Sequence, residues 1–258
     1  MLNNSNTVKK QYANSDNLST RISIHDKYST NKMGFGNWIF SNYRIESGMK
    51  ILELGCGTGD MWRERDELIS KCSKIVLSDF SEGMVATTRS KIGEHDNLDY
   101  EVIDIQNIPY ENETFDIVIA NMMLYHVPDL DLGLQEVKRV LKKSGKFYAA
   151  TYGEHGIVEH MAKLLGKYGV EDTASKVFTL QNGKDILAKY FKNVERLEYK
   201  DSLAVTDADD MVDYLYSLAS MTSLASVPRE NIKEILVQNM KDGVLNVPKE
   251  YGMFIAAD

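Results

Sequence analysis

The sequence has little cysteine and no long apolar run. Only two of its 258 residues are cysteines, Cys56 and Cys72, which is too few for a disulfide-stabilised scaffold. No apolar segment is long enough to span a bilayer, and none near the start resembles a signal peptide. No cluster of His or Cys residues with metal-ligand spacing surrounds Cys56. We therefore expect a cytoplasmic protein with reduced thiols, no membrane contact and no bound metal.

Positive charge is also in deficit. The chain has 30 Lys and Arg residues against 38 Asp and Glu residues, which gives a formal net charge of -8. A nucleic-acid backbone would meet net repulsion unless a local basic face overrode it, so we expect no nucleic-acid partner. The apolar fraction of 43% and the charged fraction of 26% are those of an ordinary globular protein. The length allows one large domain with a small appendage, as a monomer or a homodimer.

Short apolar runs recur along the first 150 or so residues. They are almost continuously hydrophobic rather than alternating, which is typical of strands buried on both faces of a parallel sheet. The five runs cover residues 50–54, 74–79, 100–104, 115–120 and 146–151. Segments able to form helices lie between them, at 59–71, at 81–92 after Ser81 as a cap, and at 129–142 after Asp129. This alternation predicts a doubly wound α/β fold.

The rest of the chain completes the sheet and predicts a helical cap over it. Strand-like runs at 194–199 and 251–257 raise the expected sheet to seven strands, most of them parallel. We expect five parts along the chain: a flexible tail over 1–20, a helical segment of the cap at 21–47, the α/β core at 48–206, a helical lid at 207–247 and a final core strand at 248–258. The lid helices could instead complete the core without touching a ligand, and the sequence leaves both readings open.

A glycine-rich turn follows the first expected strand. Its glycines are Gly55, Gly57 and Gly59, a G-x-G-x-G spacing, whereas the dinucleotide fingerprint requires G-x-G-x-x-G. Glycines at such a turn let the backbone approach a ligand closely and adopt positive φ. Glu53 precedes the turn, and a carboxylate there would oppose a pyrophosphate but suit a ligand that carries an ammonium and a sulfonium. A dinucleotide oxidoreductase is therefore disfavoured.

Acidic residues end the next two expected strands. Asp79 lies 20 residues after Gly59, where a carboxylate can accept hydrogen bonds from both hydroxyls of a ribose. Asp104 ends the third expected strand and could accept from an adenine amine. Because the carboxyl ends of parallel strands meet at one edge of a sheet, these side chains and the glycine turn should surround one crevice.

Four motifs in this order resemble the class I S-adenosylmethionine-dependent methyltransferases, and in particular the small-molecule subfamily of the ubiquinone/menaquinone-biosynthesis type, called type 11. The motifs are ELGCGTG (53–59), LSDFSEGM (77–84), DIQNIPYENETFDIVIANMMLYHV (104–127) and LQEVKRVLKKSGKFY (134–148). The resemblance spans about residues 48–152 and implies a Rossmann-like fold. It also implies S-adenosyl-L-methionine as cofactor and S-adenosyl-L-homocysteine as product.

The resemblance further implies which residues contact the cofactor. Glycines of the turn, with Cys56 between them, would border its methionine part, Glu53 would lie near its amino group and Asp79 would hold its ribose. Phe80 and Met84 would flank the adenine, although core packing alone could also explain them. The full expected set is Glu53, Gly55, Cys56, Gly57, Gly59, Asp79, Phe80, Met84, Asp104, Ile105, Asn121 and Met122, with Asn121 beneath the sulfonium.

The residues that would meet the methyl acceptor are less well defined. Tyr152 and His155 follow the fifth expected strand, and His25 lies in the N-terminal segment, so we take these three as candidate catalytic residues. His126 follows the fourth expected strand, but a histidine in this L-Y-H-V context is expected to belong to the cofactor-side loop rather than to act as a base. A base is needed only when the nucleophile still carries a proton.

The expected activity is methyl transfer to an oxygen, nitrogen or carbon nucleophile of a small metabolite. The acceptor could instead be a protein or RNA group, which would require an open cleft rather than a closed pocket. A third reading is a regulatory module that binds S-adenosylmethionine without turnover. The sequence around Asn121 lacks the N/D-P-P-Y/F signature of nucleobase amino methylation, which argues against a DNA adenine methyltransferase.

Overall fold

The structure is a computed structural model that describes residues 16–258. Its centre is a seven-stranded sheet with the order β3-β2-β1-β4-β5-β7-β6. β7 runs antiparallel to both of its neighbours, β5 and β6, while the other pairs are parallel. The strands are β1 Lys50–Leu54, β2 Lys74–Asp79, β3 Leu98–Val102, β4 Phe115–Ile119, β5 Leu141–Tyr152, β6 Asn193–Val205 and β7 Leu245–Ala257. This confirms the expected seven-stranded, mostly parallel α/β sheet.

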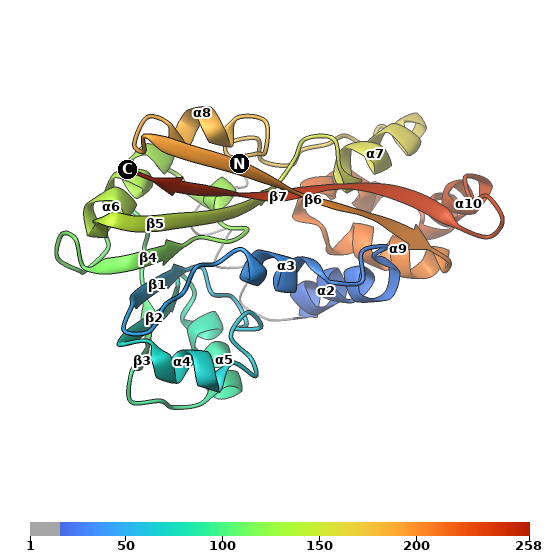
Figure 1. The fold of residues 1–258 in the computed structure, drawn as a ribbon. Coiled ribbons are helices and arrows are strands. Elements are labelled where there is room, and N and C mark those ends of the chain that lie inside the picture. Colours follow the sequence, from blue (N-terminus) through green and yellow to red (C-terminus); the bar gives the residue numbers. More distant parts are fainter. Residues whose placement is uncertain (1–15) are drawn as a thin grey trace.

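Helices cover both faces of the sheet, as Figure 1 shows. One face packs against α6 (Leu130–Val140) and α8 (Gly183–Leu187), and the other against α3 (Phe35–Ser41), α4 (Asp66–Lys71) and α5 (Glu82–Ile92). The central strands are therefore buried on both sides, which explains their continuous apolar runs: Leu52, Val76 and Val118 are each 0% exposed.

Two of the predicted helices begin where their caps suggested. Ser81 Oγ accepts a hydrogen bond from the backbone N–H of Met84 at 3.4 Å at the start of α5. Asp129 Oδ1 accepts from the N–H of Leu132 at 3.0 Å at the start of α6. Each bond satisfies one backbone donor that the first turn of a helix leaves unpaired.

The helix predicted over 59–71 is wrong in its first half. The chain turns at Gly59, whose carbonyl accepts from the N–H of Trp62 at 3.0 Å, and it turns again at Glu64, where φ is 61°. A left-handed residue interrupts a right-handed helix, so α4 begins only at Asp66. The third strand was also misplaced by two residues, because β3 ends at Val102 and not at Asp104.

The hairpin of β6 and β7 extends the sheet well beyond its other strands (Figure 1). Each of its strands has 13 residues, and their register pairs Asn193 with Ala257 at one end and Val205 with Leu245 at the other. β7 therefore begins before the final segment expected at 248–258. The extension packs with helices in a second hydrophobic core, formed by α2 (Asp16–Tyr28), α7 (Ile157–Leu164), α9 (Ala208–Ser217) and α10 (Arg229–Gln238). We call these four helices the cap.

The N-terminal segment is anchored to this extension. Of the tail expected over residues 1–20, residues 1–15 lie outside the described residues, and α2 begins at Asp16. At the other end of α2, the Tyr28 hydroxyl donates to Asp210 Oδ2 of α9 at 2.5 Å. Next to it, Ser29 Oγ donates to Asp201 Oδ2 of β6 at 2.9 Å, beside a buried ion pair between Asp201 and Lys249. These contacts fix the cap end of the N-terminal segment to the β6–β7 hairpin.

Candidate active site

A cavity of about 490 Å³ opens at the carboxyl ends of β1, β2, β4 and β5, between the sheet and the cap. Its walls come from segments far apart in the sequence, including α2, the turn after β1, the loop after β4, the segment after β5 and α9. Most of the predicted site residues line it: His25, Gly55, Gly57, Asp79, Phe80, Met84, Asp104, Ile105, Asn121, Met122 and Tyr152. Four predicted residues do not, namely Glu53, Cys56, Gly59 and His155.

The glycine turn has positive φ at all three of its glycines: 75° at Gly55, 58° at Gly57 and 76° at Gly59. A Cβ on Gly57 would meet nothing within 4 Å, and this glycine lines the cavity. A Cβ on Gly59 would instead lie 2.8 Å from Thr88 Cγ2 of α5. Gly57 thus leaves room beside the cavity, whereas Gly59 lets the turn pack against a helix.

Asp79 is held rigidly at the end of β2. Its Oδ2 accepts from the N–H of Gly57 at 3.0 Å, and its Oδ1 accepts from the N–H of Ser81 at 2.9 Å. Burial raises the pKa of this carboxyl above its ordinary value, while those backbone donors favour the ionised form. A carboxylate offers about four acceptor positions, so each oxygen can still accept from a ligand hydroxyl.

Asp104 lies in a turn two residues beyond β3, not at the strand end as predicted. Its Oδ1 accepts from the N–H of Gln106 at 2.9 Å, which orients the carboxylate. The turn nevertheless places Asp104 and the following Ile105 in the cavity wall. The contact expected between Asp104 and an adenine amine stays a prediction that this position allows.

Glu53 is buried beneath the glycine turn and does not reach the cavity wall. Its Oε2 accepts from Trp62 Nε1 at 2.5 Å. Burial raises the pKa of Glu53 to about 7, against hydrogen bonds from Trp62 and Asn121 that favour the ionised form. Cys56 is likewise buried, with Sγ 3.5 Å from Thr88 Oγ1, and burial raises the pKa of its thiol. A direct ligand contact by either residue would therefore require the turn to move.

Asn121 connects the cavity to this buried network. Its Nδ2 donates to the Tyr43 hydroxyl at 2.6 Å, while its Oδ1 is buried without a hydrogen-bond partner among the described residues. An unsatisfied buried acceptor costs free energy unless a ligand supplies a donor. Asn121 lines the cavity, so a ligand ammonium is one group that could supply it.

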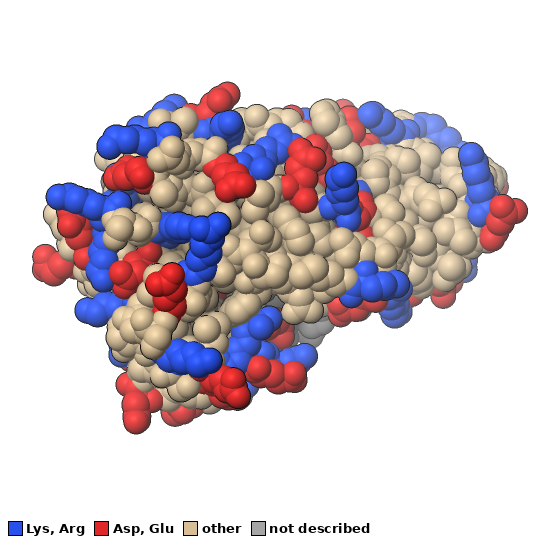
Figure 2. Space-filling view, in the orientation of Figure 1, with Lys and Arg blue, Asp and Glu red and all other residues tan. Residues whose placement is uncertain are grey.

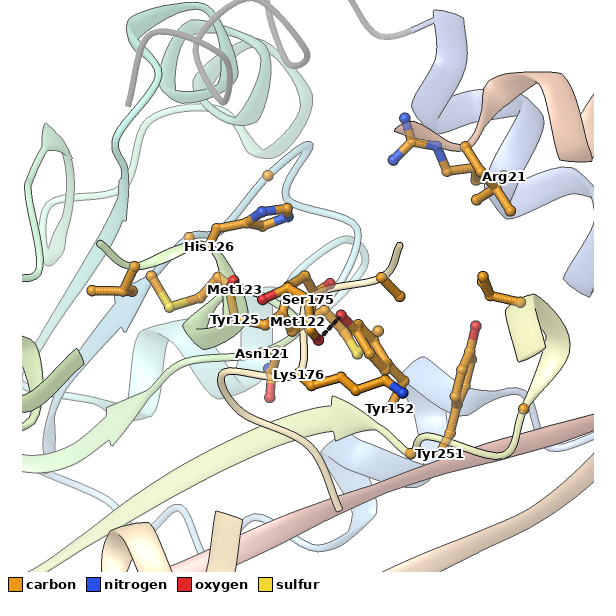
Figure 3. Close-up of a pocket in the computed structure, with 18 of the residues that line it drawn as sticks. Arg21, Asn121, Met122, Met123, Tyr125, His126, Tyr152, Ser175, Lys176 and Tyr251 are labelled. Carbon is orange, nitrogen blue, oxygen red and sulfur yellow. Dashed lines mark hydrogen bonds between the residues drawn. The ribbon is translucent and has the colours of Figure 1, made fainter. Parts of the chain in front are cut away.

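Aromatic side chains wall the cap side of the cavity. The His25 ring lies 5.9 Å from that of Tyr214 and 5.8 Å from that of Tyr251, both edge to face, and Phe35 lies 5.1 Å from Tyr251. Burial lowers the pKa of His25 to about 3, so its imidazole is neutral. In Figure 3, Tyr251 and Tyr152 rise from the strand side of the cavity toward the space between His126 and Arg21.

The candidate catalytic residues have different positions. His25 and Tyr152 line the cavity, but the Tyr152 hydroxyl already donates to the carbonyl of Ser175 at 2.7 Å (Figure 3). His155 lies outside the cavity with a side chain that is 67% exposed, and its Nδ1 is 3.6 Å from Glu159 Oε2. The structure therefore does not bring His155 to the other two.

Other lining residues went unrecognised in the sequence. Glu250 is one, and the segment Gly153 to Gly156 makes room for it: a Cβ on Gly153 would lie 2.1 Å from Glu250 Cδ. The paired glycines flanking Glu154 and His155 were the signal that could have indicated a close approach of another chain segment. Arg21, Ser175, Lys176 and Tyr251 also line the cavity, and no local pattern in the sequence marks them.

Comparison with known proteins matches the same part of the chain. Residues 52–149 match a family model described as a methyltransferase domain. Residues 52–149 therefore form a methyltransferase domain of the class I S-adenosylmethionine-dependent type. The ubiquinone/menaquinone biosynthesis C-methyltransferase UbiE of Escherichia coli is 26% identical over 186 residues, which are 70% of this chain and 74% of that protein. S-adenosylmethionine is accordingly the cofactor of this methyltransferase.

Solved structures share the fold at low sequence identity. The YcgJ protein of Bacillus subtilis superimposes with a TM-score of 0.57 at 13% identity, covering 86% of this chain and 98% of that one. The [4+2]-cyclase SpnF gives a TM-score of 0.61 at 16% identity over 98% and 96% of the two chains. A phosphoethanolamine N-methyltransferase 2 of Haemonchus contortus, solved with S-adenosylhomocysteine, gives 0.52 at 17% identity, over 93% of this chain and 52% of that one. These likenesses establish the fold alone.

The residues present fit this cofactor. The fixed Asp79 carboxylate suits vicinal hydroxyls, and the orphaned Oδ1 of Asn121 suits an ammonium donor. Among the described residues, no group of three or more His, Cys, Asp or Glu side chains could hold a metal ion. No helix in that part of the chain has the length and apolar character needed to cross a membrane.

Proposed function

We propose that this methyltransferase transfers the methyl group of S-adenosylmethionine to an oxygen, nitrogen or carbon nucleophile of a small metabolite bound beneath the cap. The observation that supports this most is the shared cavity: Asp79 and Asn121 on one side and Tyr214 and Tyr251 on the other line the same space of about 490 Å³. That volume is within the range of small-molecule sites. A metabolite in this space would have its reacting atom next to the cofactor.

In this proposal the cofactor lies along the carboxyl edge of the sheet. Gly57 would pass close to its methionine part, Asp79 would accept from its ribose hydroxyls, and Phe80 with Met84 would enclose the adenine. Asn121 would accept from the ammonium through the Oδ1 that has no other partner among the described residues. Bound S-adenosylmethionine supplies a methyl group that its positive sulfur has already activated.

The protein's own contribution would be alignment and exclusion of water. The cap places apolar and aromatic side chains opposite the cofactor residues, among them Ile157, Leu218 and Tyr214. Holding a nucleophile in line with the methyl carbon removes much of the entropic cost of a bimolecular reaction. A water-poor wall strengthens the electrostatic contacts inside.

The histidines of the cavity would be weak bases. Burial lowers the pKa of His25 to about 3 and that of His126 to about 4, with the nearby Arg21 charge lowering His126 further. Neither imidazole is matched to proton abstraction near neutral pH. A nucleophile that reacts without transferring a proton to histidine is therefore favoured.

The cap itself would be assembled from both ends of the chain. Of the expected cap segments, 21–47 would contribute α2 and 207–247 would contribute α9 and α10. α3 packs on the sheet instead, and α7 joins the cap from within the expected core of 48–206. α9 supplies Tyr214 to the cavity wall and Leu218 follows its last turn, whereas α10 supplies no lining residue among the described residues. The reading in which the lid helices only complete the core thus suits α10 but not α9.

The surface charge gives no support to an RNA acceptor. On the face drawn in Figure 2, Lys and Arg alternate with Asp and Glu, and the described residues form no continuous basic stripe there. Phosphate-backbone binding depends on such clustered positive charge. A cavity covered by a cap suits a small acceptor better than an RNA.

Incubation with methyl-labelled S-adenosylmethionine tests the proposal. The protein would be offered separate fractions of a cell extract: small molecules, RNA and protein. We expect the label in the small-molecule fraction, and less incorporation by the Asp79→Asn variant at a low concentration of the cofactor. Label only in the RNA or protein fraction would contradict the small-molecule acceptor, and cofactor binding without transfer to any fraction would indicate a regulatory module.

A further inference from the structure

Arg21 brings a positive charge to the cap side of the cavity. It lies on α2, and in Figure 3 its guanidinium stands across the space from His126, on the opposite side from Asn121 and Met123. The positive charge of Arg21 acts to lower the pKa of both His126 and Tyr214, so the guanidinium lies near both the cofactor-side loop and the aromatic wall. Any acceptor in this space would meet it.

This guanidinium has no anionic partner within the described part of the chain. The ion pairs there all involve other cations, and Arg21 Nε is buried without a hydrogen bond. The Arg21 side chain as a whole is partly exposed, but its buried Nε has no acceptor among the described residues, and an unsatisfied buried donor costs free energy. A ligand anion would remove that cost.

The carboxylates on the same side of the cavity are already engaged. Each accepts a hydrogen bond from a donor of the protein: Thr179 Oγ1 to Glu154, Lys163 Nζ to Glu159, the Ala174 N–H to Asp172, and both Gln181 Nε2 and the His155 N–H to Glu250. Lys176 Nζ, the second cation of the cavity, lies 3.9 Å from Glu154 Oε2. Of the two Lys and Arg side chains that line the cavity, Arg21 is therefore the one without a carboxylate partner among the described residues.

The remaining wall is apolar or neutral. Ile22 and Ile157 line it with Leu218, next to the aromatic cluster of His25, Tyr214 and Tyr251. Such a wall suits a hydrocarbon or ring system, and it offers no second Lys or Arg side chain without an ion pair among the described residues. A ligand that complements this wall and Arg21 would have an apolar body and one negative group.

We propose that the methyl acceptor is a small apolar acid, whose carboxylate or phosphate group pairs with Arg21 while its apolar body packs against the cap. This inference rests on the proposed small-molecule activity and narrows it. Arginine suits the role because its planar donors match carboxylate and phosphate oxygens in pairs. The anion would be held away from the cofactor sulfur, so the nucleophile is a different atom of the acceptor.

The charge of the labelled product tests the class of acceptor. The small-molecule reaction would be passed over an anion-exchange resin at mildly alkaline pH, where unreacted S-adenosylmethionine, a cation, is not retained. We expect the labelled product to be retained, and treatment with alkaline phosphatase to release it only if the group is a phosphate. A labelled product that flows through overturns this inference and leaves the proposed function standing. Absence of any labelled small product overturns both.

Substitution of Arg21 tests the residue. We expect Arg21→Gln to lower the rate of label incorporation from dilute extract at least about tenfold, the loss typical of a charged hydrogen bond, and Arg21→Lys to restore part of it. Affinity for S-adenosylhomocysteine, measured by calorimetry, should stay within about twofold, since the cofactor sites are distinct. Lys233→Gln, which neutralises an ion-paired cation of α10 outside the cavity, is the matched control and should change neither quantity.

Two results would overturn the role of Arg21. If Arg21→Gln weakens S-adenosylhomocysteine binding as much as it slows incorporation, the guanidinium belongs to the cofactor carboxylate. If the variant melts well below the wild type, Arg21 serves the fold, whereas removal of a costly unpaired charge should leave the melting temperature equal or higher.

Discussion

Trp62 Nε1 donates a hydrogen bond to Glu53 Oε2 at 2.5 Å, directly beneath the glycine turn. Both side chains are buried, at 1% and 2% exposure. The indole N–H therefore satisfies a carboxylate that water cannot reach. Because the two residues flank the G-x-G-x-G segment, their bond ties the end of β1 to the chain that leaves the turn.

Trp62→Phe should destabilise the protein by removing that donor. Phenylalanine keeps most of the aromatic packing against Phe40, whose ring lies 5.7 Å away. The carboxylate then loses a partner in a buried site, which costs about 1–3 kcal/mol of unfolding free energy. Urea unfolding followed by circular dichroism measures the loss.

Trp38→Phe is the control for Trp62→Phe. Trp38 is half-buried on α3 and stacks on Phe35 at 5.9 Å, so the substitution makes the same change of ring without touching Glu53. If both variants lose equal stability, the loss reflects indole packing and the role of the Trp62 hydrogen bond is refuted.

Glu53 should make stability depend on pH in a direction opposite to that of most carboxylates. Burial raises its pKa to about 7, above its ordinary value of 4.5. The folded state then holds a proton that the unfolded state releases, so the contribution is fully present below about pH 4.5 and is lost as pH rises through about 7. Relative to Glu53→Gln, the wild type should lose roughly 3 kcal/mol across this window. Urea titrations at several pH values compare the two, and parallel profiles would show that Glu53 does not titrate there.

The cofactor motifs were predictable because they are local. Gly55, Gly57 and Asp79 lie at strand ends within one stretch of chain, and the periodicity of the buried strands fixes which ends share an edge. The errors in the predicted helices also had local causes. A left-handed Glu64 shortened the helix expected from 59, because side-chain pattern does not report on φ.

The cap side could not be derived in the same way. Its wall joins α2, the segment after β5, α9 and β7, and the packing of the long β6–β7 hairpin brings them together only in the folded chain. Arg21 and Tyr251 come from opposite ends of the sequence, with no shared spacing to connect them. Glu53, expected near the amino group of the cofactor, is buried outside the cavity wall, where Trp62 Nε1 donates to its carboxylate.

Gly59→Ala should destabilise the protein more than the same substitution at another glycine with positive φ. An alanine at φ 76° is strained, and its Cβ would also lie 2.8 Å from Thr88 Cγ2. Gly93, at φ 88°, has nothing within 4 Å of the same position and provides the matched control. We expect Gly59→Ala to lose roughly 1–3 kcal/mol more than Gly93→Ala, the usual cost of overpacking. Thermal melting of both variants measures this, and equal losses would mean that Thr88 simply moves aside.

Asp79→Asn should weaken cofactor binding and also remove one of the two backbone hydrogen bonds that Asp79 accepts from Gly57 and Ser81. Asparagine retains an oxygen for one backbone donor but loses the full acceptor set that two hydroxyls would use. Calorimetric titration with S-adenosylhomocysteine should show a loss of roughly 1–3 kcal/mol. Asp99→Asn, at an exposed ion pair with Lys74, is the control and should bind normally. Unchanged affinity in Asp79→Asn would remove Asp79 from the cofactor site.

His155→Ala should leave methyl transfer nearly unchanged. The His155 side chain is 67% exposed and lies outside the cavity. It contacts two lining residues: its Nδ1 is 3.6 Å from Glu159 Oε2, and its backbone N–H, which alanine preserves, donates to Glu250 Oε2 at 2.7 Å. We expect a rate of label incorporation within about twofold of the wild type, since an exposed pair such as His155 with Glu159 contributes little. His25→Ala, which opens the aromatic wall of the cavity, should slow incorporation much more. A large loss in His155→Ala with normal folding would instead restore His155 as a catalytic residue, reached by a movement of the loop between β5 and α7.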